Sequence, residues 1–165
     1  MALKPDRFTV ENEIAYFCND VAIRGVLLGF STAGSGVSLD QTANLAVVPG
    51  ANPSGVKPLG VLMNDMVNTD LTRYHINFYK DEMPVGGKCT ILKKGWIVTD
   101  KIFPGNTPVG NGDTAYMGPS GLFATQAYAG GFQATGVGAY ALLPVGKFLS
   151  SKDERGFAKV EVLLP

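Results

Sequence analysis

Glycine and proline interrupt this sequence so often that long helices are hard to build from it. The chain has 165 residues, of which 21 are glycine and 10 are proline, and no segment keeps a long apolar period of 3.6 residues. Short runs rich in β-branched and aromatic residues lie between the turn signals. This pattern is typical of a small barrel or sandwich. We therefore predict a mainly β fold, a small β-barrel with long loops, in one domain over residues 21–165. Residues 1–20 should form an extended N-terminal arm or a first strand.

Two sequence patterns suggest where strands begin and turn. A Pro-x-Gly motif occurs at 58–60, 84–86, 108–110 and 144–146. Proline fixes one backbone dihedral and glycine permits a sharp bend, so each copy should form a corner from which a strand starts. The segment 89–99, CTILKKGWIVT, predicts a hairpin with its turn at Lys-Lys-Gly. Two further strand pairs are expected, at 114–117 with 122–125 and at 142–149 with 157–164.

The charge balance indicates which partners the chain is suited to bind. Lysine plus arginine number 14, as do aspartate plus glutamate, and charged residues are only 17% of the chain. A net charge near zero provides no field for phosphate backbones, so we expect no nucleic-acid partner. No apolar run approaches the roughly 20 residues that cross a bilayer, so we expect no membrane partner. A surface poor in charge suits a protein that packs against other proteins.

The residues that could support catalysis or metal binding are few and scattered. His75 is the only histidine, and Cys18 and Cys89 are the only cysteines. This set lacks the ligand number and spacing of a zinc site, and nothing local supports a Cys89–His75 nucleophile pair. The acidic residues do not follow a calcium-loop spacing. We therefore expect no enzyme activity, no metal and no cofactor. With no secretory signal, the cysteines are predicted to be buried free thiols in a protein made in a reducing cytoplasm.

Aromatic and aliphatic residues in two segments are candidate protein contacts. Those in the N-terminal segment have no obvious helical or strand partner within it, and two more lie in a glycine-rich loop, where rings often anchor protein contacts. The candidates are Phe8, Val10, Ile14, Tyr16, Phe17, Tyr128 and Phe132.

The second half of the chain resembles the capsid decoration, or cement, proteins of tailed bacteriophages. The resemblance rests on KCTILKKGWIVTD (88–100), on PVGNGDTAYMGPSGLFATQ (108–126), and on LLPVGKFLSSKDERGFAKVEVLLP (142–165). Its short motifs are the Gly-Asp-x-x-Tyr strand at 112–116, the strand at 121–125, the glycine-bearing strand at 145–148 and the final Val-x-Val strand at 160–162. The first third of the chain and residues 128–138 depart from the family pattern.

This resemblance implies a β-tulip-like domain and a structural role in the virion. Proteins of this family bind the outer surface of an assembled capsid and clamp neighbouring major capsid protein subunits. The resemblance also implies a homo-oligomer on the shell, a trimer in preference to a dimer. The protein would then be made in the cytoplasm of a host bacterium and would act on the outside of the particle.

Two other classes of function remain open from the residues themselves. Another structural β protein of the virion, such as a tail tube or baseplate subunit, would share the low charge and the glycine content. Assembly of the isolated protein into rings or tubes would favour it. An enzyme or a small-ligand-binding barrel is the second class, and a metal or ligand in the purified protein would favour that.

Overall fold

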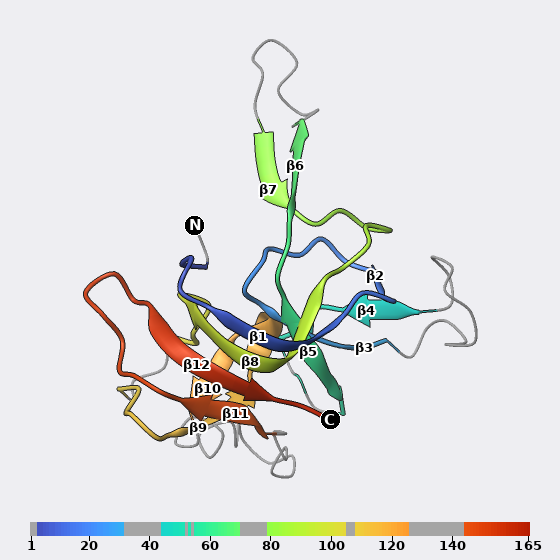
Figure 1. The fold of residues 1–165 in the computed structure, drawn as a ribbon. Coiled ribbons are helices and arrows are strands. Elements are labelled where there is room, and N and C mark those ends of the chain that lie inside the picture. Colours follow the sequence, from blue (N-terminus) through green and yellow to red (C-terminus); the bar gives the residue numbers. More distant parts are fainter. Residues whose placement is uncertain are drawn as a thin grey trace.

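The computed structural model describes residues 3–31, 44–51, 53, 55–69, 79–104, 108–125 and 144–165. Within them the chain is mainly β, as predicted, with a single short helical turn, η1 (Pro119–Gly121). Figure 1 shows the strands gathered in one body, from which one hairpin projects. The strands of the first half are β1 (Phe8–Glu13), β2 (Phe17–Cys18), β3 (Leu27–Phe30), β4 (Leu45–Val47), β5 (Pro58–Leu62), β6 (Met66–Thr69) and β7 (Tyr79–Glu82). The strands of the second half are β8 (Ile91–Thr99), β9 (Thr114–Met117), β10 (Phe123–Thr125), β11 (Pro144–Phe148) and β12 (Ala158–Leu163).

One ten-stranded sheet contains all of these strands except β6 and β7. Its order is β10-β9-β11-β12-β8-β5-β3-β4-β2, with β1 paired to β8 beside this path. The described strands do not form a closed barrel ladder. Two backbone hydrogen bonds nevertheless link β10 back to the chain just after β8: the Phe123 amide donates to the Lys101 carbonyl (2.9 Å), and the Phe103 amide to the Phe123 carbonyl (2.8 Å). The sheet is therefore strongly curled around its second-half core.

The hairpin predicted at 89–99 is wrong, because this segment is the single long strand β8. Lys94 and Gly95 lie in its middle and pair with β12 on one side and β1 on the other. Gly95 has a φ of +143°, and a Cβ there would overlap the carbonyl oxygen of Phe8. The glycine thus allows β1 to approach closely, which in the sequence is indistinguishable from a turn signal.

Residues 3–20 are part of the sheet and do not extend away from it as a separate arm. Leu3 is buried, and the Lys4 amide donates to the Val98 carbonyl at 3.0 Å. Strand β1 then runs antiparallel to β8, and β2 pairs with β4. Lys4 also forms an ion pair with Asp153 at 2.5 Å. The backbone groups along one edge of β8 require partners, and this segment supplies them.

Among the described residues, the buried side chains form two apolar clusters, and strands β5 and β8 contribute to both. The larger cluster lies among β8, β9, β10, β11 and β12 and includes Phe123 and Phe148, whose rings meet edge to face at 6.5 Å. The smaller cluster lies under β2, β3, β4 and β5 and includes Cys18 and Cys89. Both cysteines are buried and unpaired, in agreement with the prediction of free thiols.

The four Pro-x-Gly motifs divide into two structural types. In β5 and β11 the strand begins at the proline, and the glycine lies inside the strand. A Cβ at Gly60 would stand 2.5 Å from the Leu92 carbonyl oxygen, and a Cβ at Gly146 would overlap the Glu161 carbonyl oxygen. The motifs at 84–86 and 108–110 precede strands, as expected. In β5 and β11 the glycine therefore allows the neighbouring strand to pack closely, and it does not form the expected corner before the strand.

Candidate protein-contact surface

Strands β1, β8 and β12 are neighbours in the sheet, and one side of the sheet that they form faces solvent. We call this side the outer face. Residues paired across neighbouring strands point to the same side of a sheet. Phe8 pairs with Trp96, which pairs with Glu161. Lys94 pairs with Leu163 of β12. On the opposite side of β12, valines 160 and 162 are buried in the core. The outer face therefore carries Phe8, Trp96 and Leu163 together with charged side chains.

An aromatic pair forms the centre of the outer face. The rings of Phe8 and Trp96 stack at a centroid distance of 6.4 Å and an interplanar angle of 25°. The Nζ of Lys159 lies 3.3 Å from the centre of the Trp96 ring, in a cation–π contact. The same ammonium is 3.9 Å from Asp6 Oδ2. These contacts orient Trp96, so the surface is partly ordered before any partner binds, which lowers the entropic cost of binding.

Apolar side chains remain largely exposed around this pair. Phe8 is 56% exposed, Val10 65% and Leu163 67%. Two charged residues beside them form an ion pair, in which Lys94 Nζ is 2.8 Å from Glu11 Oε2. This hydrogen bond and the charge of Lys94 lower the pKa of the Glu11 carboxyl. An apolar centre with neutralised charges at its rim resembles the general composition of protein interfaces.

Strand β1 also presents backbone groups that a partner could use. Among the described strands it pairs only with β8, so its other side is a sheet edge. The register shifts between Thr9 and Glu11, which leaves Val10 in a bulge without a cross-strand partner. Exposed edge strands can accept a strand from another chain. The bulge limits such pairing to a short stretch and favours a side-chain contact at Val10.

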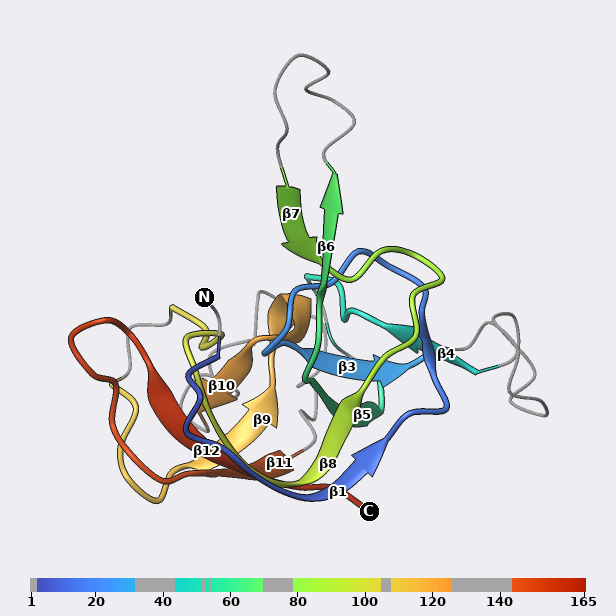
Figure 2. The same cartoon turned by 45° about the horizontal axis from the view of Figure 1, so that its top comes forward.

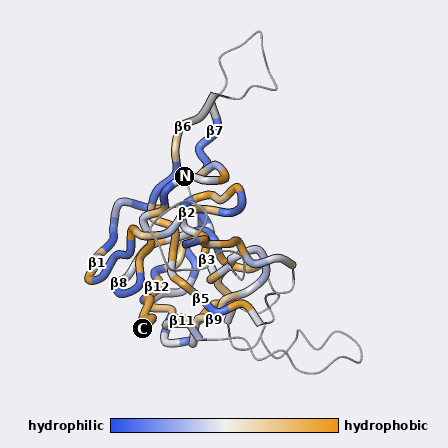
Figure 3. The backbone as a smooth tube through the Cα atoms, turned by 90° about the vertical axis from the view of Figure 1, so that its right-hand side faces the viewer, coloured by the Kyte–Doolittle hydropathy of each residue, from blue (hydrophilic) through white to orange (hydrophobic). Residues whose placement is uncertain are grey.

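A second surface is the hairpin formed by β6 and β7. These strands make a separate two-stranded sheet that projects from the body (Figures 1 and 2). Met66 and Val67 are both exposed, although neighbouring strand residues point to opposite faces. In Figure 3, β6 is the more hydrophobic strand and β7 is hydrophilic. An isolated two-stranded hairpin is marginally stable in water, so contact with a partner would stabilise it.

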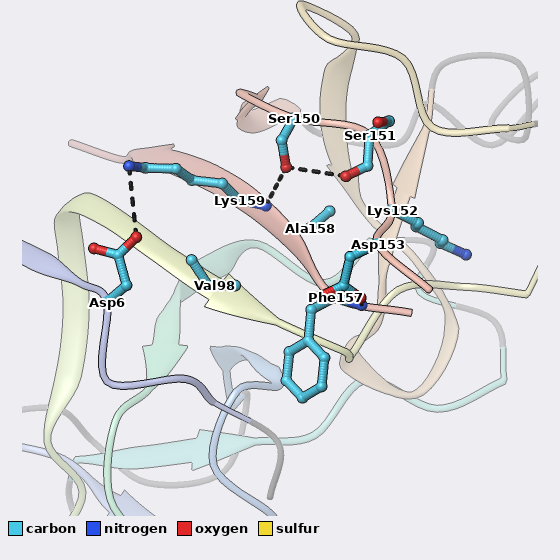
Figure 4. Close-up of a pocket in the computed structure, with 9 residues that line it drawn as sticks. All are labelled: Asp6, Val98, Ser150, Ser151, Lys152, Asp153, Phe157, Ala158 and Lys159. Atoms are coloured by element: carbon cyan, nitrogen blue, oxygen red, sulfur yellow. Dashed lines mark hydrogen bonds and ion pairs between the residues drawn. The ribbon is translucent and has the colours of Figure 1, made fainter. Parts of the chain in front are cut away.

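The cavity in Figure 4 lies against a surface loop. The side chains that line it do not form an arrangement typical of a catalytic site. The cavity measures about 370 Å³ and lies beside the chain from Ser150 to Lys159. Its polar groups satisfy each other: the Lys159 amide donates to Ser150 Oγ at 2.9 Å, and the Phe157 amide donates to Asp153 Oδ1 at 2.8 Å. The hydrogen bonds from Lys4 and from backbone amides lower the pKa of the Asp153 carboxyl. The cavity thus offers a set of paired charges without a nucleophile–base arrangement.

The structure separates the candidate contact residues into three groups. Phe8, Val10 and Ile14 are exposed. Tyr16 and Phe17 are half-buried, since the Tyr16 ring packs edge to face against Phe30 at 5.8 Å and Phe17 belongs to β2. The other two candidates, Tyr128 and Phe132, lie outside the described residues, as does His75.

Two residues of the outer face were missed as contacts by reasoning from the sequence. The predicted hairpin at 89–99 contains Trp96, and Leu163 belongs to the predicted last strand, at 157–164. The alternation of Val160 and Val162 already indicated that Leu163 would face the other way. No comparable signal exists for Trp96, which is half-buried, because its place on the outer face depends on β8 being one continuous strand.

Comparison with protein families and curated proteins adds no functional clue to this geometry. Among the described residues, no three histidine, cysteine or acidic side chains gather where they could hold a metal ion. In that same part of the chain, no helix is long and apolar enough to cross a membrane. No protein-family model matches the sequence, and it matches no curated protein.

Proposed function

We propose that this protein is a structural component of a bacteriophage particle that binds the outer surface of the capsid and clamps neighbouring major capsid protein subunits. The observation that carries the proposal is the exposed apolar group on the outer face, centred on Phe8, Val10 and Leu163. The sequence resemblance supplies the identity of the partner. The low charge of the chain and its mainly β fold are compatible with the same role.

The energetics of a shell suit a surface of this kind. A patch of a few exposed apolar residues gives modest affinity at a single contact. Repeated contacts, made by several copies joined in one oligomer, raise the effective affinity by orders of magnitude without any new type of contact. Modest single contacts also allow the protein to dissociate and rebind until each copy has found its place on the lattice.

Changing Val10 to lysine tests the outer face directly. The side chain is exposed and lies in a bulge, so the domain should keep its fold. A lysine there would have to be desolvated in the interface, and we expect binding to shells to weaken at least about tenfold, or ~1.4 kcal/mol. The measurement is co-sedimentation with capsids of the phage that encodes this sequence, assembled without the protein.

The matched control is Val85→Lys, because Val85 is 62% exposed against 65% for Val10. It lies in the loop between β7 and β8, away from the outer face, and its substitution should leave shell binding unchanged. Equal binding by both variants and the unchanged protein would contradict a role for the outer face. Rings or tubes formed by the isolated protein, with no binding to shells, would support a tail tube or baseplate subunit instead.

We further propose that the protein binds as a homo-oligomer, a trimer in preference to a dimer, and that the β6–β7 hairpin contributes to the contact between copies. The exposed apolar residues on both hairpin faces support this assignment. A trimer at a three-fold axis uses one interface three times.

Replacing Val67 with aspartate is expected to reduce self-association. Val67 is 66% exposed, so a monomer loses little stability from the change, whereas a charge buried between copies is costly. Sedimentation equilibrium should show a trimer for the unchanged protein and a dissociation constant at least about tenfold higher for the variant. An identical oligomer for V67D would remove the hairpin from the interface.

A further inference from the structure

Cys18 and Cys89 lie on two short segments that run antiparallel to each other. Phe17 and Lys88 form an isolated antiparallel bridge. The Cys18 amide donates to the Gly87 carbonyl at 2.8 Å, and the Cys89 amide donates to the Tyr16 carbonyl at 2.9 Å. These two hydrogen bonds flank the Phe17–Lys88 pair, which has no backbone hydrogen bonds of its own. In antiparallel strands, the Cα atoms of such a non-hydrogen-bonded pair lie closer together than those of a hydrogen-bonded pair. The two cysteines are therefore diagonal neighbours on one face of the pair.

The residue opposite Cys18 is Gly87, and the space beside its Cα is filled by Met83, whose Sδ a Cβ there would overlap. The Cys89 Sγ donates to the Gly87 carbonyl at 3.7 Å. The interaction with the Cys89 thiol lowers the pKa of the Cys18 thiol, whereas the interaction with Cys18 and burial together raise the pKa of the Cys89 thiol. Both side chains belong to the same apolar cluster.

We propose that Cys18 and Cys89 are a site of oxidative cross-linking, which joins β2 to the chain before β8 by a disulfide when the protein meets a small-molecule disulfide. The site is independent of the proposed function. Cysteines far apart in the fold could not react in this way, whereas these two lie on adjacent segments joined by backbone hydrogen bonds. A shift of the short β2 segment towards the chain before β8 would bring the two sulfurs to bonding distance.

The reaction is thiol–disulfide exchange with an oxidant such as oxidised glutathione. The Cys18 thiolate attacks one sulfur of glutathione disulfide, so that a mixed disulfide forms and one glutathione thiolate leaves. Cys89 then loses its proton and attacks the Cys18 sulfur, which releases the second glutathione. In total, two protein thiols lose two protons and two electrons, and one glutathione disulfide takes them up to become two glutathione thiols.

Access to the buried thiols comes from local opening of the sheet. Strand β2 has 2 residues and is the last strand in the order of the sheet, paired with β4 through Phe17 and Cys18. Short strands at a sheet end open at lower free energy than the core. We therefore expect the reaction to be slower than that of an exposed thiol and to proceed without global unfolding.

The test is incubation of the folded, reduced protein with oxidised glutathione. We expect both thiols to disappear, the mass to fall by two hydrogens, and peptide mapping to find Cys18 joined to Cys89 within one chain. The bond closes a loop of about 70 residues, and the melting temperature should rise by about 5 °C or more. The variants C18A and C89A should instead keep glutathione on the single remaining cysteine.

Two outcomes would overturn the proposal. One is that both thiols stay free in the folded protein under conditions that oxidise the urea-unfolded chain. The other is that each cysteine takes up its own glutathione and no internal bond forms. Because the mapping is done on the unchanged protein, a folding defect of either alanine variant does not affect the decision.

Discussion

The substitution Gly146→Ala is expected to lower the free energy of unfolding by at least about 3 kcal/mol. Gly146 lies inside β11 and pairs with Val162 of β12. A Cβ at this position would overlap the carbonyl oxygen of Glu161 and would stand 3.1 Å from the Val162 Cα. These atoms are backbone and cannot rotate away, so the two strands would have to separate. Urea denaturation followed by tryptophan fluorescence measures the change.

Gly50→Ala is the matched control for this substitution. It adds the same methyl group where nothing lies within 4 Å of the new Cβ, and we expect a change within about 0.5 kcal/mol. Denaturation midpoints of G146A and G50A that coincide would mean that β11 and β12 do not approach as described.

Phe148→Ala is expected to cost about 3–5 kcal/mol of stability. The ring is fully buried in the larger cluster and meets Phe123 edge to face, with an interplanar angle of 72°. Removing it leaves a cavity between strands that are held by backbone hydrogen bonds and cannot close around the space. Because strands on both sides of this cluster would loosen, the melting transition should also become less steep.

Phe30→Ala removes the same atoms in a different setting. Phe30 is 41% exposed, and its ring also has an edge-to-face partner, Tyr16. The two variants therefore differ mainly in burial, and we expect F30A to cost about 1 kcal/mol. Equal losses in F148A and F30A would show that ring pairing, and not burial, dominates the contribution of Phe148.

The parts of the fold that were predictable are those whose contacts are close in sequence. The pair β9 and β10 lies at 114–117 and 123–125, as expected, and β11 pairs with β12 across the charged loop. In both pairs the turn residues and the alternation of buried side chains are local features. The short chain between the strands leaves few alternative pairings.

The wrong prediction for β8 shows the opposite case. Lys-Lys-Gly is a typical turn signal, and on this pattern Gly95 is predicted to lie in a turn. Its role follows from Phe8, which lies more than 80 positions earlier in the chain and approaches it through β1. The local sequence does not distinguish a glycine that is needed for a turn from a glycine that is needed for close contact with a distant strand.

The sequence by itself determined the β class, the scarcity of catalytic groups and the candidate status of Phe8 and Val10. These properties depend on composition and on local alternation. Only the tertiary structure decided that Phe8, Trp96 and Leu163 share one face, and that Cys18 and Cys89 meet. Both results depend on the register between distant strands, and a shift of one residue would turn every side chain of a strand to the other face.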